Sequence, residues 1–354
     1  MSATAAPLLT IGIPTYNRAH ELDNLLASIV REMKTITPGL IDILVADNAS
    51  EDNTREVVAK YQQECTAIQY IHTDVNQGMQ SNFVRLMDAC AGEYLHMIGD
   101  DEIVLEDGLS IILQALQANR NVSIFVFNYR YEAELDRPVH LVEACGHPID
   151  TNVCNVQDFI FRHGWLWTLG NLGMVIVKTA PLRAVDRTPY MSHFFMQAAF
   201  YLDVFHGDLI LFVNRPIFLT FVRSQTVNKE RWEHDGSVGG WPYIWDSIDY
   251  LIKKEVLPPQ LPLGFYNHCS SSWNPSWNLL LDHMIKRINS GNTKVDDKDW
   301  RDVARWIEKL DDIPQRERIL AAVESLRISY NISKSSLVNF GRLASLLKNT
   351  IGAF

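Results

Sequence analysis

Short apolar runs alternate with amphipathic segments through the first 130 residues, and this alternation restricts the fold more than any other feature of the chain. The predicted strands are residues 8–13, 41–46, 68–72, 94–98 and 122–128. The predicted helices begin after Asn17, whose side chain we expect to act as an N-cap, and then cover 54–64, 81–91 and 106–116. Because the connections are short, this order predicts an α/β fold in which helices cover both faces of a mostly parallel sheet.

The pattern weakens after Arg130 and changes again after Ser224. Strands at 173–177 and 209–213 and a helix at 192–204 are expected to continue the same sheet. Beyond them, the glycine-rich segment 231–241 is typical of a mobile flap. The helices predicted after it are 276–288, 297–310, 315–326 and 335–349. We therefore divide the chain into a ligand-binding domain, 1–225, and a loop with a helical region, 226–354.

Composition excludes several classes of protein. The 354 residues are 47% hydrophobic, which is enough for a full core, and the net charge of −10 with no Lys/Arg block argues against nucleic-acid binding. The start of the chain has no basic, apolar leader and no apolar run reaches bilayer length, so we expect a soluble, cytoplasmic protein. A zinc site could be built from Cys145, His147, Cys154 and His163, but their spacing matches no common zinc site.

Three consecutive acids, Asp100, Asp101 and Glu102, follow the predicted strand 94–98. Open α/β sheets bind ligands at the carboxyl ends of their strands, where these acids would emerge. Carboxylates this close repel one another, so a divalent cation or water must offset their charge. Oxygen ligands favour Mg²⁺ or Mn²⁺ bridged to phosphates, whereas the alternative is an ordinary solvated acidic turn.

Polar residues also follow the other strands of the predicted sheet. They are Pro14, Thr15, Tyr16, Asn17 and Arg18 after the first strand, Asp47 after the second, and Asn76, Gly78 and Asn82 after the third. Each alone is compatible with an ordinary cap or turn. Together at one sheet edge they suit a nucleoside diphosphate, because Asp47 can accept the N3 hydrogen of a pyrimidine and Thr15 can line the base or ribose.

These motifs resemble the inverting family 2 glycosyltransferases with the GT-A fold. Residues 13–18 are similar to the opening motif of that family, 45–54 to its V-D-D-G-S-x-D-x-T segment, and 76–82 to its N-x-G turn. Residues 98–101 stand where the family has its metal-binding acids. The resemblance is closest to bacterial abequosyltransferase-like and rhamnosyltransferase-like members; it is clear over 8–128, looser to 223 and absent afterwards.

The resemblance implies a role for each acid and a class of substrate. Asp47 would contact the base, Asp100 the ribose, and Asp101, together with Asp100, a Mn²⁺ or Mg²⁺ ion. The donor would be a nucleoside-diphosphate sugar and the acceptor a glycan or lipid-linked glycan in bacterial surface polysaccharide synthesis. Ala46 replaces the first acid of the base-binding pair, which leaves the preferred base open.

The acid pair that supplies the catalytic base in this family is not evident before Gly207. His193 is our candidate base, with Asp203 and His163 as the next candidates. His234, in the glycine-rich segment, is a candidate metal ligand or phosphate contact. Trp165, Trp167 and Trp232 are candidates for stacking on sugar rings, and packing within the core is the alternative for each.

Other functions stay open at this point. A non-catalytic nucleotide-sugar or carbohydrate-binding protein would keep the fold without the base. A sugar nucleotidyltransferase or a dehydrogenase fits less well, because no glycine-rich loop follows the first strand. The apolar face of helix 335–349 could pack in a bundle, mediate a homo-oligomer, or bind the inner face of a membrane peripherally.

Overall fold

A computed structural model describes residues 6–132, 142–143, 149, 151–191, 195–221, 240–266, 300–301, 304–305 and 307–335. In the first half the elements are β1 (Leu9–Thr15), α1 (Ala19–Met33), β2 (Ile41–Asp47), α2 (Thr54–Glu64), β3 (Ile68–His72), α3 (Met79–Ala89), β4 (Tyr94–Met97), β5 (Glu102–Val104), α4 (Gly108–Ala118) and β6 (Ile124–Glu132). They continue as β7 (Val142–Glu143), β8 (Cys154–Asn155), α5 (Val156–His163), α6 (Trp165–Leu169), η1 (Leu172–Met174), β9 (Val175–Lys178), η2 (Ala180–Arg183), η3 (Thr188–Tyr190), α7 (Met196–Phe205), β10 (Leu209–Phe221), α9 (Gly240–Lys253), η5 (Leu263–Tyr266) and α12 (Ile313–Ser335).

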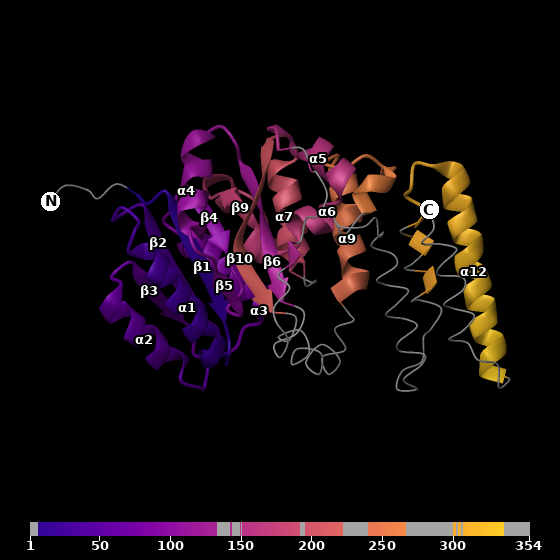
Figure 1. Cartoon of the computed structure of the whole chain (residues 1–354). Helices are drawn as coiled ribbons and strands as arrows, with labels where there is room; N and C mark the ends of the chain where they lie inside the picture. The colour runs from indigo at the N-terminus through magenta and orange to yellow at the C-terminus, as the bar shows by residue number, and fades with distance from the viewer. Residues whose placement is uncertain are drawn as a thin grey trace.

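The N-terminal half of the sheet is parallel, as the sequence predicts. β1 pairs with β2 and β4, and β2 pairs with β3, which gives the order β3-β2-β1-β4. The chain moves outward from β1 to β2 and β3 and then returns to place β4 on the other side of β1. Because crossovers between parallel strands are right-handed, this return puts α1 and α2 on one face of the sheet and α3 on the other. In agreement, α1 packs on α2 while α3 packs on β1 and β2 (Figure 1). The carboxyl ends of β1, β2 and β4 consequently share one edge.

The second half of the sheet contains antiparallel pairs that the sequence did not predict. β9 runs antiparallel to both β4 and β6, β10 is parallel to β6, and β5 is antiparallel to β10. The strands predicted at 173–177 and 209–213 are thus confirmed within the same sheet. β5 was not predicted: Glu102, the third of the consecutive acids, begins a strand of three residues.

Residues beyond the sheet add helices at the end of the molecule remote from α2 (Figure 1). α9 contacts α7, and Leu261 forms a bridge with Leu310. The helix predicted at 315–326 is confirmed and runs from residue 313 to 335. The helices predicted at 276–288 and 335–349 lie outside the described residues, except that α12 ends at Ser335. Most of segment 231–241 also lies outside them, but Gly240 and Trp241 begin α9 and are not part of a loop.

Among the described residues, no helix combines the length and apolar character needed to cross a membrane. The boundary that we drew at residue 225 stays a prediction.

Candidate active site

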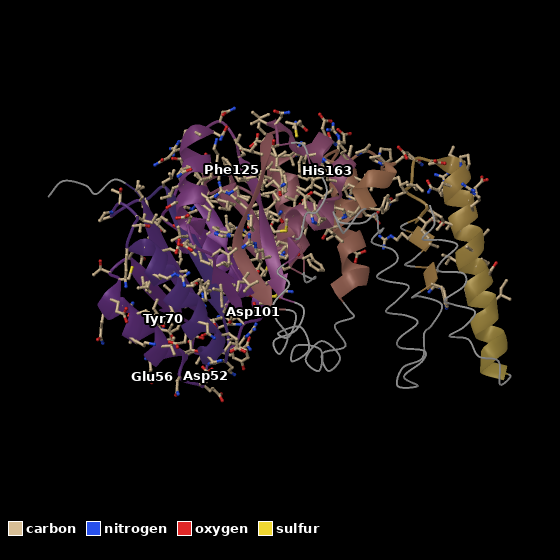
Figure 2. The ribbon with its side chains drawn as sticks, in the orientation of Figure 1. Asp52, Glu56, Tyr70, Asp101, Phe125 and His163 are labelled. Carbon is tan, nitrogen blue, oxygen red and sulfur yellow. The ribbon has the colours of Figure 1, made fainter. Side chains whose placement is uncertain are left out.

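The ends of β1 and β2 place the first two polar motifs side by side. Thr15 pairs with Asp47 in the parallel register, and the Asn48 amide donates to the Thr15 carbonyl at 3.0 Å. Figure 2 shows Asp101 and Tyr70 toward this same edge of the sheet, with Phe125 toward the opposite one. The structure therefore brings together residues from four separate stretches of sequence, as the parallel order predicts.

Asp100 and Asp101 share one cationic partner, the Arg18 guanidinium. One terminal nitrogen of Arg18 lies 3.0 Å from Asp100 Oδ1, and the other donates to Asp101 Oδ2 at 2.9 Å. The Thr15 hydroxyl donates to Asp100 Oδ2 at 2.8 Å. Burial raises the pKa of Asp100 to about 7, although the positive charge of Arg18 opposes that rise. Two carboxylates, a hydroxyl and a guanidinium thus form one compact cluster at the end of β1 and β4.

Glu102 turns away from this cluster. Its carboxyl accepts a hydrogen bond from the Gly99 amide at 3.2 Å and is buried against Gly173. Burial and the two neighbouring aspartates raise the pKa of Glu102 well above its usual value. A Cβ on residue 173 would lie 2.3 Å from Glu102 Oε2, so only glycine leaves room for this carboxyl. The three consecutive acids therefore separate into a pair at the site and one interior residue.

Asp47 is held on both of its carboxylate oxygens. Oδ1 accepts from the Ser50 amide at 2.9 Å, and Oδ2 accepts from the Tyr70 hydroxyl at 2.5 Å. Burial and the negative charge of Asp47 raise the pKa of Tyr70 to about 12, so the phenol stays protonated and donates. Tyr70 was not predicted, because it lies inside β3, opposite Val45 in the register, and only the tertiary structure brings its hydroxyl to Asp47.

Asn82 and Arg85 support the same strand end from α3. The buried Asn82 amide donates to the Ala46 carbonyl at 2.9 Å, and Arg85 donates to the Asp47 carbonyl at 2.7 Å and to Asn82 Oδ1 at 2.6 Å. Two further guanidine nitrogens of Arg85, Nε and Nη1, are buried without a hydrogen-bond partner. Arg85 was not predicted, although its spacing of three from Asn82 puts both on one helical face.

The turn after β3 is tied to the turn after β2. The Asn48 side chain donates to Asn76 Oδ1 at 2.8 Å and accepts from the Gln77 amide at 3.0 Å. Gly78 has a φ of 86°, a left-handed conformation that favours glycine. Asn76 and Gly78 are both exposed, so they shape the rim of the site.

Asn17 does not cap α1, which corrects our prediction. Its φ is 52°, and its side chain accepts from the Glu51 amide at 2.7 Å instead. The first amide of α1, Ala19 N, donates to Asp52 Oδ2 at 2.9 Å. The cap therefore comes from the loop after β2. Hydrogen bonds join this loop to the loop after β1. Pro14 stands opposite Ala46 in the β1–β2 register, and Tyr16 lies half-buried between Thr15 and this turn.

Of the three candidates for the general base, Asp203 and His163 lie within the described residues. His193 and His234 lie outside the described residues, so their roles stay predictions. Asp203 accepts from the Tyr190 hydroxyl at 2.8 Å and from Lys254 Nζ at 2.6 Å on both oxygens, which indicates a structural ion pair. His163 lies against Phe159 on α5, far from Asp101 in Figure 2.

The expected sugar-stacking role of two tryptophans is wrong. Trp165 is fully buried and stacks on Phe265 at 5.6 Å, and Trp167 is also buried, with its ring 5.9 Å from that of Phe212. Both side chains belong to the core between the sheet and the helices that follow it, so they cannot reach a ligand. Trp232 lies outside the described residues.

The acid pair has the chemistry that a divalent cation requires. Mg²⁺ and Mn²⁺ take oxygen ligands, and one or two carboxylates complemented by substrate phosphates are a common arrangement. Asp100 and Asp101 already converge on a single positive group, within 3.0 Å of its nitrogens. In the part of the chain that the structure describes, no third His, Cys, Asp or Glu joins them in a metal-binding geometry. Further ligands would come from substrate and water.

Comparisons with known proteins agree with this architecture. The family model described as Glycosyl transferase family 2 matches residues 10–183. The abequosyltransferase RfbV of Salmonella typhimurium is 32% identical over 116 residues, which are 32% of this chain and 34% of that protein. A GalNAc(5)-diNAcBac-PP-undecaprenol beta-1,3-glucosyltransferase of Campylobacter jejuni is 30% identical over 110 residues, 30% of this chain and 34% of that protein. The chain thus spans about a third of the length of these curated relatives.

Solved structures share the fold at low sequence identity. S. aureus TarS, in a complex with UDP-GlcNAc, has a TM-score of 0.56 at 13% identity, over 90% of this chain and 87% of that one. The mannosyltransferase PcManGT of Pyrobaculum calidifontis, in complex with GDP-Man and Mn²⁺, has a TM-score of 0.51 at 13% identity, over 99% and 88%. From the family match and this shared fold together, we identify residues 10–183 as a family 2 glycosyl transferase domain of the GT-A type.

Proposed function

We propose that this protein is a metal-dependent inverting glycosyltransferase that moves a sugar from a nucleoside diphosphate to an acceptor hydroxyl. The observation that supports this most directly is the convergence of Asp100 and Asp101 on one cation beside Thr15 and Asp47. The base and ribose would bind toward Asp47 and Thr15, and the diphosphate toward the acid pair.

The chain's own residues would orient the donor. Asp47, held by Ser50 and Tyr70, presents a fixed hydrogen-bond acceptor to the edge of the base. Arg85 lies next to it, with Nε and Nη1 buried and without a hydrogen-bond partner.

Departure of the sugar builds negative charge on the diphosphate. Asp101 and Asp100 would hold a Mn²⁺ or Mg²⁺ ion, which supplies Lewis-acid stabilisation of that charge. A general base, for which His193 remains our candidate, would take the proton of the acceptor hydroxyl as it attacks the opposite face of the sugar. Attack from that side in one step inverts the anomeric centre. His234 remains a candidate for a further metal or phosphate contact.

The acceptor is proposed from the relatives. One is named as acting on an undecaprenol-linked glycan and another as an abequosyltransferase, so we propose a glycan or lipid-linked glycan in bacterial surface polysaccharide synthesis. The donor nucleotide stays open, because the neighbouring structures hold UDP-GlcNAc and GDP-Man respectively. Peripheral contact with a membrane and self-association also stay proposals.

A thermal-shift panel tests the proposal. UDP, GDP, CDP and dTDP are each added with and without Mn²⁺, and the preferred base should stabilise the protein strongly only with the metal. Asp101→Asn should lose this stabilisation, whereas Lys60→Gln, which breaks an exposed ion pair on α2, should keep it. Equal stabilisation of Asp101→Asn, or none by any nucleotide, would count against the assignment.

A further inference from the structure

Arg18 occupies the position that a metal ion would need. Its guanidinium bridges the two carboxylates through separate nitrogens, 3.0 Å from Asp100 and 2.9 Å from Asp101. The cluster is well shielded from water, because the Arg18 and Asp101 side chains are each 19% exposed and Asp100 is 6% exposed. Charged groups in such a place interact strongly, since less solvent screens them.

A metal and the guanidinium cannot both keep these contacts. A Mg²⁺ ion binds carboxylate oxygens at about 2.0–2.1 Å. Placed on the oxygens that Arg18 now contacts, it would lie within a few ångströms of the guanidinium carbon, and three positive charges would then face two negative ones. The repulsion falls only if Arg18 moves away or if an anion joins the cluster.

Arg18 can move because of where the chain holds it. It precedes α1 directly as its N-cap residue, with φ −141° and ψ 45°, while the neighbouring Ala19 amide is fixed by Asp52. The backbone is therefore anchored, but the long side chain can swing about its own torsions. A guanidinium released from carboxylates pairs well with phosphate oxygens, which it meets through the same two-pronged geometry.

We propose that Arg18 is a resident counter-ion of Asp100 and Asp101 that a divalent cation displaces and that then pairs with the donor diphosphate. The metal alone binds weakly, because it must displace a bound cation and leave that cation without a partner. The nucleotide alone binds weakly, because Arg18 remains on the carboxylates. Each ligand therefore strengthens binding of the other by the same factor, as linkage requires.

This inference rests on the proposed function, and it explains why the divalent cation and the nucleotide would bind cooperatively. Coupling between two ligands is commonly about 5–150-fold in affinity. We expect a factor in this range for wild-type protein with Mn²⁺ and its preferred nucleoside diphosphate. Arg18 also offsets part of the charge of the acid pair when no donor is present.

Calorimetric titration tests the proposal on the full chain. Mn²⁺ affinity is measured without nucleotide, and the affinities for UDP, GDP, CDP and dTDP are each measured with and without Mn²⁺. In Arg18→Gln, Mn²⁺ alone should bind about tenfold or more tightly than in wild type, and the enhancement of nucleotide binding by Mn²⁺ should shrink toward one. Lys60→Gln removes a positive charge from the surface of α2 and should change neither value.

Two further measurements guard against misfolding. Arg18→Lys keeps the charge but has only one nitrogen for two carboxylates, so its Mn²⁺ affinity should lie between those of wild type and Arg18→Gln. In EDTA, Arg18→Gln should melt below wild type and should gain more from added Mn²⁺. Unchanged Mn²⁺ affinity, or full coupling retained in Arg18→Gln, overturns the counter-ion role while leaving the transferase assignment intact. Wild type that binds neither Mn²⁺ nor any nucleotide overturns both.

Discussion

Replacement of Asp203 by asparagine distinguishes a structural ion pair from a catalytic base. Asp203 is buried on α7, and both of its oxygens accept from Lys254 Nζ at 2.6 Å, while Oδ2 also accepts from the Tyr190 hydroxyl at 2.8 Å. Tyr190 belongs to η3 and Lys254 follows α9, so one carboxylate joins three segments that are distant in sequence. Asn has nearly the same size but no charge, so the substitution removes the electrostatic part of this junction.

The expected loss comes mainly from the tyrosine. A hydrogen bond to a charged acceptor contributes roughly 1.5–3 kcal/mol. The Lys254 side chain is 43% exposed, so solvent screens its ion pair and the contribution falls to about 0–1 kcal/mol. We therefore expect Asp203→Asn to lower the free energy of unfolding by about 1.5–4 kcal/mol.

Urea denaturation of Asp203→Asn, Tyr190→Phe and the double variant provides the assay. Because the two residues share one hydrogen bond, the double variant should be destabilised by less than the sum of the single variants. Stabilisation of the folded variant by Mn²⁺ and nucleotide should match wild type. Unchanged unfolding together with a loss of transfer by about 100-fold or more would refute the structural role and restore Asp203 as a base.

Three other perturbations have defined outcomes. Asp101→Ala should abolish the Mn²⁺-dependent shift given by nucleotides, while the melting temperature in EDTA changes by only a few degrees; a retained shift would exclude Asp101 from the metal site. The pKa of Asp100 is raised from 3.8 to about 7, so the folded state binds more protons than the unfolded chain between these values. Asp100 should therefore contribute a fall in stability of at most about 1.4 kcal/mol per pH unit as pH rises from about 4 to 7 in EDTA. In a pH series of urea titrations Asp100→Asn should make the slope shallower by that contribution, and the part from Glu102 and Asp42, whose pKa values burial also raises, should remain. Gly173→Ala should cost about 1–3 kcal/mol in a urea titration, since its Cβ would meet Glu102 Oε2 at 2.3 Å and Phe218 Cζ at 2.8 Å; wild-type stability would show that the Glu102 carboxyl is free to move.

The sequence predicted the parallel half of the sheet well because that half follows local rules. α2 and β3 begin and end where the pattern predicts, and the polar residues after β1, β2 and β4 meet at one edge. The hydrophobic period of each segment and the short connections between segments are local features, so they can be recognised without knowing what packs against them.

Predictions failed where a partner distant in sequence decides the outcome. Asn17 has the residue type of a helix cap, but Asp52 takes that place because the loop after β2 lies against the start of α1. Trp165 and Trp167 have the residue type of a sugar platform, but the sheet and Phe265 enclose them. Residue type alone does not say whether water or protein faces a side chain.

The sequence by itself determined the α/β architecture and the meeting of the polar motifs and the acids at one sheet edge, the candidate site. Only the tertiary structure decided that Glu102 faces the interior, that Tyr70 and Arg85 support Asp47, and that Arg18 holds Asp100 and Asp101. The physical reason is that the apolar pattern of a buried strand can be recognised from its own residues. A charged side chain instead takes the partner that the packed chain brings within hydrogen-bond distance, and Arg18 and Asp101 are 83 residues apart in the sequence.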